Sequence, residues 1–196
     1  MADTHEYFRP GWPATPPREG EVILRESTPA DVPLAIELST DPYVPLIGTL
    51  PAQASEEQAL AWIDRQRGER LAQRRGLSFA IAEADTNLAV GQIGLWLAEL
   101  PQGRATAGYF VGPSARGRGI AAAALVALTR FAWTIPDLHR IELYIEPWNV
   151  ASTRTAERAG YEREGLLRSH QRIGGARRDM LLYAAIRSGD EHSVPN

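Results

Sequence analysis

The sequence predicts a mixed α/β (α+β) domain with a mostly antiparallel sheet flanked by helices. Seven segments have the residue types and alternation that are typical of strands, and short turns connect several of them. One glycine-rich connection in the middle of the chain leads from a strand into a long helix and then to another strand. The 196 residues suffice for one ordinary domain with a buried core.

The N-terminal part is predicted to hold an arm, one strand and two helices. Residues 1–20 are rich in proline and are predicted to form an irregular arm with no helix or strand of its own. The first strand is predicted at residues 22–26. Residues 27–31 carry an N-cap residue followed by proline, which predicts a helix to about Leu38. The second helix opens at Ser55 with acids in its first turn and ends at arginines 70, 74 and 75.

The prolines after Asp41 predict a loop between these two helices, and the remaining elements follow from alternation and from helix stops. The later strands are predicted at residues 77–83, 88–99, 105–111, 139–146, 161–167 and 180–186. Two further helices are predicted at residues 117–133 and 150–159, and Gly160 stands where a helix commonly ends. Gly174 and Gly175 predict the last turn. We expect one domain over residues 21–187 and a polar tail over 188–196.

Composition narrows the function classes. The net charge is −3, which disfavours a nucleic-acid partner, and the absence of cysteine excludes a thiolate nucleophile. The four histidines are scattered, so no metal site is expected. All 21 basic residues are arginine, which excludes a Walker-type phosphate loop and Schiff-base chemistry. With neither a secretion signal nor an apolar run long enough for a bilayer, we expect no membrane partner and a cytoplasmic location.

The segment from Arg116 to Ala121 has the composition of an anion-binding turn. A strand ends before it, and a helix starts within it. The first N–H groups of a helix have no partner inside the helix and favour an anion together with the helix dipole. Gly117 and Gly119 let the backbone approach an anion closely, and Arg116 and Arg118 add donors that suit phosphate.

A dinucleotide site is the alternative interpretation of the same turn. Gly117-x-Gly119-x-x-Ala122 fits that fingerprint, and Glu142 or Glu146 follows at about the expected distance of 20 residues. The fingerprint should open a domain with several parallel strand–helix–strand units. Only one such unit is predicted here, which argues against a nicotinamide-dependent reductase.

Two strings resemble a known family. Arg116-x-x-Gly119-x-Ala121 resembles the pyrophosphate-binding motif of the GNAT N-acetyltransferase superfamily. Asn149-x-x-Ser152, followed by Arg158-x-Gly160-Tyr161-x-x-x-Gly165, resembles the signature of its RimJ/RimL-type branch, whose members include ribosomal-protein N-terminal acetyltransferases. The resemblance extends over about residues 22–187.

This resemblance implies a seven-stranded GNAT-like sheet, splayed between its fourth and fifth strands, with acyl-CoA in the cleft. Acetyl-CoA is the expected co-substrate, without a metal, and a primary amine is the expected acceptor, with a homodimer compatible with the family. Backbone groups of Phe110 and Val111 would pair with the pantetheine arm, and Asn149 and Ser152 would lie near the thioester. The residues expected to bind the cofactor are Phe110, Val111, Arg116, Gly117, Arg118, Gly119, Ile120, Ala121, Asn149 and Ser152.

The catalytic candidates are less well defined. The N–H of Val111 could stabilise the oxyanion, and the Ser152 hydroxyl is expected near the leaving sulfur, although Ser152 could instead cap or pack its helix. Strand alternation places Glu142 and Glu146 on one face, so either could accept the amine proton, and a salt bridge, for example with Arg140, is the alternative for each. The acceptor stays open between a protein N-terminus and a small-molecule amine. A non-catalytic acyl-CoA-binding module also stays open.

Overall fold

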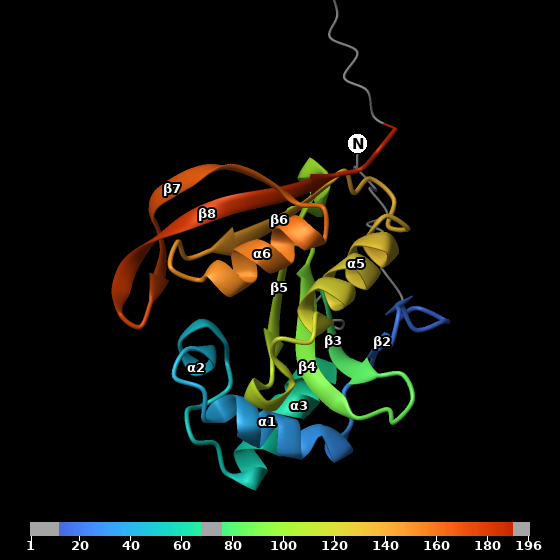
Figure 1. Ribbon diagram of the computed structural model, residues 1–196, viewed down its shortest axis with the longest axis vertical. Coiled ribbons are helices and arrows are strands. Elements are labelled where there is room, and N and C mark those ends of the chain that lie inside the picture. The colour runs from blue at the N-terminus through green and yellow to red at the C-terminus, as the bar shows by residue number, and fades with distance from the viewer. Residues whose placement is uncertain (1–11, 68–75, 190–196) are drawn as a thin grey trace, which may run out of the picture.

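An eight-stranded mixed sheet forms the centre of the computed structural model, which describes residues 12–67 and 76–189 (Figure 1). The strands are β1 (Arg18–Glu19), β2 (Val22–Arg25), β3 (Gly76–Glu83), β4 (Ala89–Trp96), β5 (Arg104–Val111), β6 (Arg140–Ile145), β7 (Glu162–Ile173) and β8 (Ala176–Ile186). The α-helices are α1 (Val32–Ser39), α2 (Val44–Ile47), α3 (Glu56–Arg67), α5 (Ile120–Ala132) and α6 (Val150–Arg158). Three single turns of 3₁₀ helix are η1 (Pro29–Asp31), η2 (Leu100–Gln102) and η3 (Pro113–Ala115).

The strand order is β1-β2-β3-β4-β5-β6-β8-β7, and its pairing confirms the predicted fold class. Every neighbouring pair is antiparallel except β5 and β6, which are parallel and are connected by a crossover through α5. A dinucleotide fold requires a largely parallel sheet. The pairing therefore disfavours the reductase interpretation of the glycine turn.

The sheet has eight strands rather than the predicted seven because β1 lies inside the segment predicted to be irregular. Arg18 pairs with Ile23, and Glu19 pairs with Val22. A strand of two residues leaves no alternation that could be recognised in a sequence. The first half of the predicted arm, residues 1–11, lies outside the described residues.

Other boundaries differ in ways that matter for the site. The short helix α2 lies where the sequence predicted a loop, since Pro45 occupies a first-turn position that a helix tolerates. The last two strands are longer than predicted and reach the turn at Gly174 and Gly175 from both sides. As a result, β7 and β8 form a long hairpin that projects beyond β6 (Figure 1). The arginines predicted to end the second helix, and most of the polar tail, lie outside the described residues.

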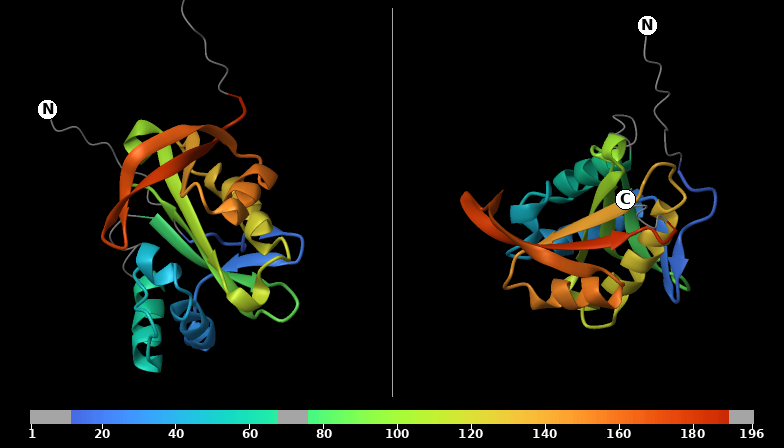
Figure 2. Two further views of the ribbon diagram at one scale, coloured as in Figure 1. Left: turned by 60° about the vertical axis from the view of Figure 1, so that its left-hand side comes forward. Right: turned by 90° about the horizontal axis from the view of Figure 1, so that it is seen from above.

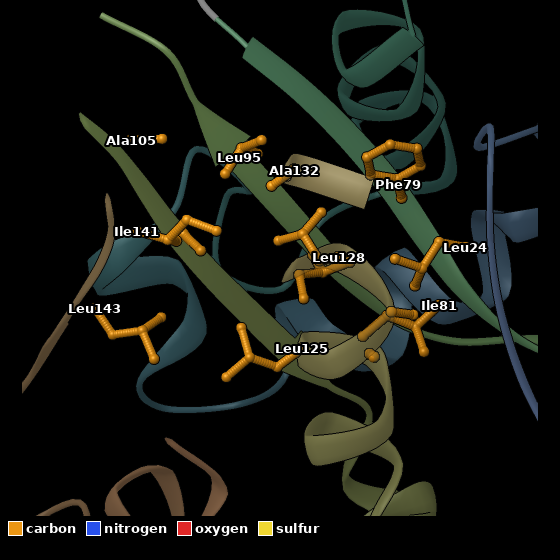
Figure 3. Close-up of a cluster of buried hydrophobic side chains, with 14 of the residues drawn as sticks. Leu24, Phe79, Ile81, Leu95, Ala105, Leu125, Leu128, Ala132, Ile141 and Leu143 are labelled. Atoms are coloured by element: carbon orange, nitrogen blue, oxygen red, sulfur yellow. The ribbon is translucent and has the colours of Figure 1, made fainter. Parts of the chain in front are cut away.

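The two faces of the sheet are covered by different helices (Figure 2). Leu77, Phe79 and Ile81 of β3 point to the face on which α5 packs, and they belong to the main core. Leu125 and Leu128 of α5 belong to the same core, and Figure 3 shows them among side chains of the strands. The intervening Ala80 belongs to a second cluster with residues of α1 and α3. This follows from the two-residue period of a strand, and it gives the sheet an α5 face and an α1–α3 face.

The sheet separates between β5 and β6, as the resemblance implied. Their parallel pairing covers only three residue pairs and ends at Thr106 and Glu142. Beyond this point β5 continues to Val111 and β6 to Ile145 without pairing to each other. The facing edges of the two strands are therefore unpaired toward the glycine turn, and the space between these edges is called the β5–β6 cleft. Among the helices described, none has the length and apolar character needed to cross a membrane.

Candidate functional site

The glycine turn joins the end of β5 to the start of α5. Gly117 and Gly119 have φ values of +79° and +78°, a left-handed conformation that favours glycine. Gly119 is the N-cap of α5, and the first backbone bond of the helix is donated by Ala123 N–H to the Gly119 carbonyl over 3.1 Å. The N–H groups of residues 119–122 donate no backbone hydrogen bond within the described part of the chain. Free N–H groups at a helix N-terminus are suited to an anion.

The surroundings of this turn leave room for a ligand. A Cβ placed on Gly117 or on Gly119 would have no heavy atom within 4 Å. A hollow on one side of the turn lies between α5 and the β1–β2 and β3–β4 connections. Arg118, Gly119, Ile120 and Ala123 contribute to its lining, but so do four acids, Glu19, Glu21, Glu83 and Asp85, and Glu83 already pairs with Arg118. An anion is repelled by such a lining. The side of the turn that faces the β5–β6 cleft is therefore the better place for a phosphate group.

Arg116 links the turn to the segment between α1 and α2. Its Nη2 lies 2.6 Å from Asp41 Oδ2, and its Nε donates to the Val111 carbonyl over 3.1 Å. Burial opposes the charge on Asp41, but hydrogen bonds from Arg116, Tyr43 N–H and Val44 N–H outweigh it and lower the pKa of Asp41. Arg116 therefore fixes the geometry of the turn as well as contributing positive charge.

Arg118 and Glu37 hold the turn from other directions. The Nη2 of Arg118 lies 2.6 Å from Oε1 of Glu83, in an exposed ion pair. Glu37 of α1 accepts a hydrogen bond of 2.8 Å from the N–H of Ser114 in η3. Both arginines predicted for phosphate thus have carboxylate partners in this structure.

The cleft edge of β5 presents the backbone of alternate residues. Gly112 N–H donates to the Val90 carbonyl on β4, over 2.9 Å. Because successive N–H groups of a strand point to opposite edges, Val111 N–H and Tyr109 N–H point away from β4 and into the cleft. The backbone of Phe110 points toward β4 instead, so the predicted pair of backbone contacts becomes Tyr109 and Val111. Which backbone groups of β5 point into the cleft can be decided only from the β4–β5 register, and the sequence alone does not give that register.

Asn149 and Ser152 lie at the start of α6, across the cleft from β5. Asn149 is the N-cap of this helix, and its Oδ1 accepts a hydrogen bond of 3.1 Å from Ser152 N–H. The Tyr109 hydroxyl donates to the Ser152 carbonyl over 3.3 Å. Burial raises the pKa of Tyr109, although hydrogen bonds with Ser152 and Thr155 act in the opposite direction. Tyr109, to which sequence reasoning gave no role, thus connects Ser152 to the cleft edge of β5.

Glu142 has the salt bridge that was the alternative to a role as general base. Its Oε1 lies 2.6 Å from Arg140 Nε, and its Oε2 accepts a hydrogen bond of 2.6 Å from the Tyr144 hydroxyl. Burial works against ionisation, but these bonds outweigh it and lower the pKa of Glu142. His170 stacks on Tyr144, with 4.8 Å between ring centroids. A carboxylate with two partners and a lowered pKa has little capacity to accept another proton.

Glu146 directly follows β6, beyond the point where this strand has separated from β5. It is 4% exposed and lies 3.7 Å from Arg178 Nε on β8. Burial, together with the carboxylate of Glu146, raises the pKa of Tyr43, which precedes α2. The Tyr43 ring contacts Trp148 edge to face, with 4.9 Å between centroids. Three segments far apart in sequence therefore meet at Glu146, and nothing in the local sequence of Tyr43 indicated this.

No group of three or more histidine, aspartate or glutamate side chains arranged to hold a metal ion occurs among the described residues. The groups that this site offers to a bound molecule are backbone amides, hydroxyls, and carboxylates that already have protein partners. The arrangement can bind a phosphorylated ligand at the turn and extend it along the cleft edge of β5.

Comparisons with known proteins give the family of the chain. Residues 21–162 match the family described as acetyltransferase (GNAT) domain. A probable N-acetyltransferase of Bacillus subtilis, YjcK, is 31% identical over 126 residues, which are 63% of this chain and 68% of the relative. An uncharacterized N-acetyltransferase of Bacillus licheniformis, p20, is 29% identical over 109 residues, which are 56% of this chain and 61% of that relative.

A solved structure agrees over a greater length. RimJ of Mycobacterium smegmatis, in complex with a CoA disulfide, is 27% identical, with a TM-score of 0.76, over 96% of this chain and 93% of that one. The chain therefore belongs to the GNAT family, whose enzymes are N-acetyltransferases, and its resemblance to the RimJ/RimL-type branch is confirmed. The alignments with the two Bacillus relatives cover about two thirds or less of their lengths.

Proposed function

We propose that the protein transfers an acetyl group from acetyl-CoA to a primary amine. The amine attacks the thioester directly while both substrates are bound, and residues 21–187 form the catalytic domain. The observation that carries this proposal is the continuity between the open edge of β5 and the amide-lined turn after it. Pantetheine is an extended chain with two amides, and pyrophosphate is an anion, so CoA needs these two features in this order.

On the donor side, the N–H groups of residues 119–122 hold the pyrophosphate, and Gly117 allows its close approach. Arg116 and Arg118 raise the local positive potential. The cleft edge of β5 at Tyr109 and Val111 lies beside the end of the pantetheine arm, and Asn149 and Ser152 border its sulfur. The RimJ structure, which contains a CoA disulfide, supports a CoA ligand for this fold.

Three groups supply the chemistry. The Val111 N–H, directed into the cleft, stabilises the negative charge that develops on the thioester oxygen. The Ser152 hydroxyl protonates the leaving thiolate. Of the two acids weighed as general base, Glu146 is the better choice because Glu142 is held by Arg140 and Tyr144. The Tyr43 hydroxyl, whose pKa the carboxylate of Glu146 helps to raise, can relay the amine proton to Glu146.

Titration calorimetry with acetyl-CoA and with NADPH tests the donor part of this proposal. We expect acetyl-CoA to bind and NADPH to show no heat of binding at the same concentrations. Tight binding of NADPH without binding of acetyl-CoA would overturn the proposal. A panel of primary amines, assayed by thiol release, then separates catalysis from mere binding.

A further inference from the structure

A hollow of about 240 Å³ lies on the α1–α3 face of the sheet, on the opposite side of β5 from α5. It is lined by α3, by the residues that follow α2, and by β3, β4 and β5. All of its lining residues are uncharged. Aromatic rings of Trp62, Trp96 and Phe110 contribute to the wall, so the hollow can take an uncharged group but offers no opposite charge to an ion.

Three buried polar side chains form a hydrogen-bonded chain in this hollow. The Gln92 Nε2 donates to Ser78 Oγ over 2.7 Å, and Ser78 Oγ donates to Gln66 Oε1 over 3.1 Å. The exposed fractions of Gln66, Ser78 and Gln92 are 4%, 4% and 5%. A primary amide has two N–H donors and one carbonyl acceptor, and buried polar groups normally use theirs.

Part of this hydrogen-bonding capacity has no protein partner. These two bonds leave both N–H groups of Gln66 without a partner among the described residues, and they also leave the carbonyl and one N–H of Gln92 without one. If the oxygen and nitrogen atoms of both side-chain amides were interchanged, the same kinds of groups would be unused, with the roles of Gln66 and Gln92 exchanged. No side-chain N or O atom that is fully shielded in the described part of the chain lacks a partner. The unused amide groups therefore face the hollow, where they present both donors and an acceptor.

The walls favour a flat group. Gly94 on β4 pairs with Gly108 on β5. A Cβ on either glycine would come within 3.2 Å or 3.1 Å of the Trp96 ring, so only glycine lets this ring lie across both strands. The Trp62 indole N–H donates to Thr49 Oγ1 over 3.2 Å, which fixes the opposite wall.

The hollow adjoins the proposed thioester position through β5. The Phe110 side chain lines the hollow, while the backbone of its neighbours Tyr109 and Val111 borders the cleft. The hollow therefore lies on the face of the same strand whose cleft edge borders the proposed thioester position. An acceptor bound in the hollow near Phe110 can extend its amine past β5 toward the thioester.

We infer that this hollow is the acceptor subsite and that it selects an amine whose neighbouring group is an uncharged amide. This inference rests on the proposed function and names its substrate class. A carboxylate or a second ammonium group would lose its hydration in the hollow without meeting an opposite charge. A carboxamide instead offers one acceptor and one or two donors in a plane, which matches the unused groups of Gln66 and Gln92.

Three acceptors that differ only in this group provide the test. Glycinamide, glycine and ethylenediamine carry the same aminomethyl group beside an amide, a carboxylate and an ammonium. Their kcat/KM with acetyl-CoA, corrected to the concentration of neutral amine, should favour glycinamide at least tenfold over each of the others. Calorimetry with the CoA-bound protein should give the same order of affinity, and it decides the test if turnover is slow. Glycyl-glycinamide shows whether the amide can belong to a peptide chain.

Variants of the two glutamines link the preference to the hollow. Gln92→Leu and Gln66→Leu should lower kcat/KM or affinity for glycinamide at least tenfold and leave acetyl-CoA affinity unchanged. Gln66→Glu keeps an acceptor for the Ser78 hydroxyl and should shift the preference toward ethylenediamine. Gln102→Leu, at an exposed site in η2, is the matched control, and thermal unfolding of each variant verifies that it folds.

The outcomes separate this inference from the proposed function. If acetyl-CoA binds but glycine or ethylenediamine is preferred, or if the glutamine variants keep the wild-type preference, the subsite assignment is wrong and the donor site stands. If acetyl-CoA does not bind, the proposed function itself fails.

Discussion

The donor turn and the acceptor hollow lie on opposite sides of β5 and are built in different ways. The turn presents backbone N–H groups, and its shape depends on two glycines with positive φ. The hollow presents side chains from α3, β3, β4 and β5, which are distant in sequence. A backbone site leaves a short motif in the sequence, whereas a side-chain site of this kind leaves no motif at all.

The two regions also differ in charge. The turn has a helix N-terminus and two arginines, and it suits an anion. The hollow is lined only by uncharged residues and suits a neutral group. Because of this difference, we expect CoA binding and acceptor choice to respond to separate substitutions.

The largest effect is expected from Gly119→Glu. A side chain at φ +78° is strained, and a carboxylate at the helix N-terminus repels pyrophosphate. We expect acetyl-CoA affinity to fall at least about 100-fold in calorimetry, because charge and shape both oppose binding. Gly175→Glu is the control, since Gly175 has a φ of +83° in the β7–β8 turn, away from α5. Equal affinity of the Gly119 variant and wild type would show that the turn is misassigned.

The second largest effect is expected from Glu146→Gln, which should impair catalysis without impairing the binding of acetyl-CoA. Glu146→Gln should lower kcat about 100-fold, the lower end of the range for general acid–base catalysis, with little change in the KM for acetyl-CoA. Glu142→Gln serves for comparison and should lower kcat less than tenfold, because Arg140 and Tyr144 already occupy that carboxylate. The reverse order would return the role of base to Glu142.

Much of the fold and the donor turn could be predicted from the sequence, for physical reasons. Period-two alternation and glycine stops are local, so β2 to β6 and α6 were predicted within a few residues, whereas β7 and β8 extend further toward their turn than was predicted. The segment Arg116–Ala121 was predicted as an anion turn because its glycines and its helix start are adjacent in the chain.

The rest depended on contacts between distant residues. The partners of Glu146 are Tyr43 and Arg178, which come from opposite ends of the chain. The chain Gln66–Ser78–Gln92 joins one helix to two strands, and each of these residues alone is an ordinary polar residue. Likewise, the orientation of the Phe110 backbone depends on the β4–β5 register.

A stability effect is expected at the contact between the donor turn and α2. Asp41→Ala leaves Arg116 and the N–H groups of Tyr43 and Val44 without their carboxylate acceptor. The free energy of unfolding at pH 7 should fall by about 2 kcal/mol, as is typical for hydrogen bonds to a charged group. Urea unfolding measures this loss, and a change below about 0.5 kcal/mol, the level of an ordinary surface substitution, would contradict the role given to Asp41.

The same carboxylate should give a pH dependence. Because the folded-state pKa of Asp41 is lowered, its contribution is present above the ordinary value of 3.8 and is lost as the pH falls through the folded-state value. The stability difference between wild type and Asp41→Asn should therefore be constant near neutral pH and shrink below pH 3.8. A difference that stayed constant down to acid unfolding would exclude this linkage.

The smallest effect is expected for Arg118→Gln. Arg118 and Glu83 form an exposed ion pair, which contributes less than about 1 kcal/mol to stability. Acetyl-CoA affinity should fall only a few-fold, and the difference from wild type should narrow as salt is added. Unfolding curves and calorimetry at two ionic strengths measure both quantities. A loss as large as that of Gly119→Glu would mean that the side chain, rather than the backbone, dominates phosphate binding.

Amine-dependent thiol release tests the central claim most directly. The protein is mixed with acetyl-CoA in the presence and absence of glycinamide, and free CoA and acetylated amine are quantified together by mass spectrometry. We predict that CoA and N-acetylglycinamide appear in equal amounts and only when protein and amine are both present. Binding of acetyl-CoA without acetyl transfer to any primary amine, or release of CoA without acetylated product, would contradict an N-acetyltransferase function.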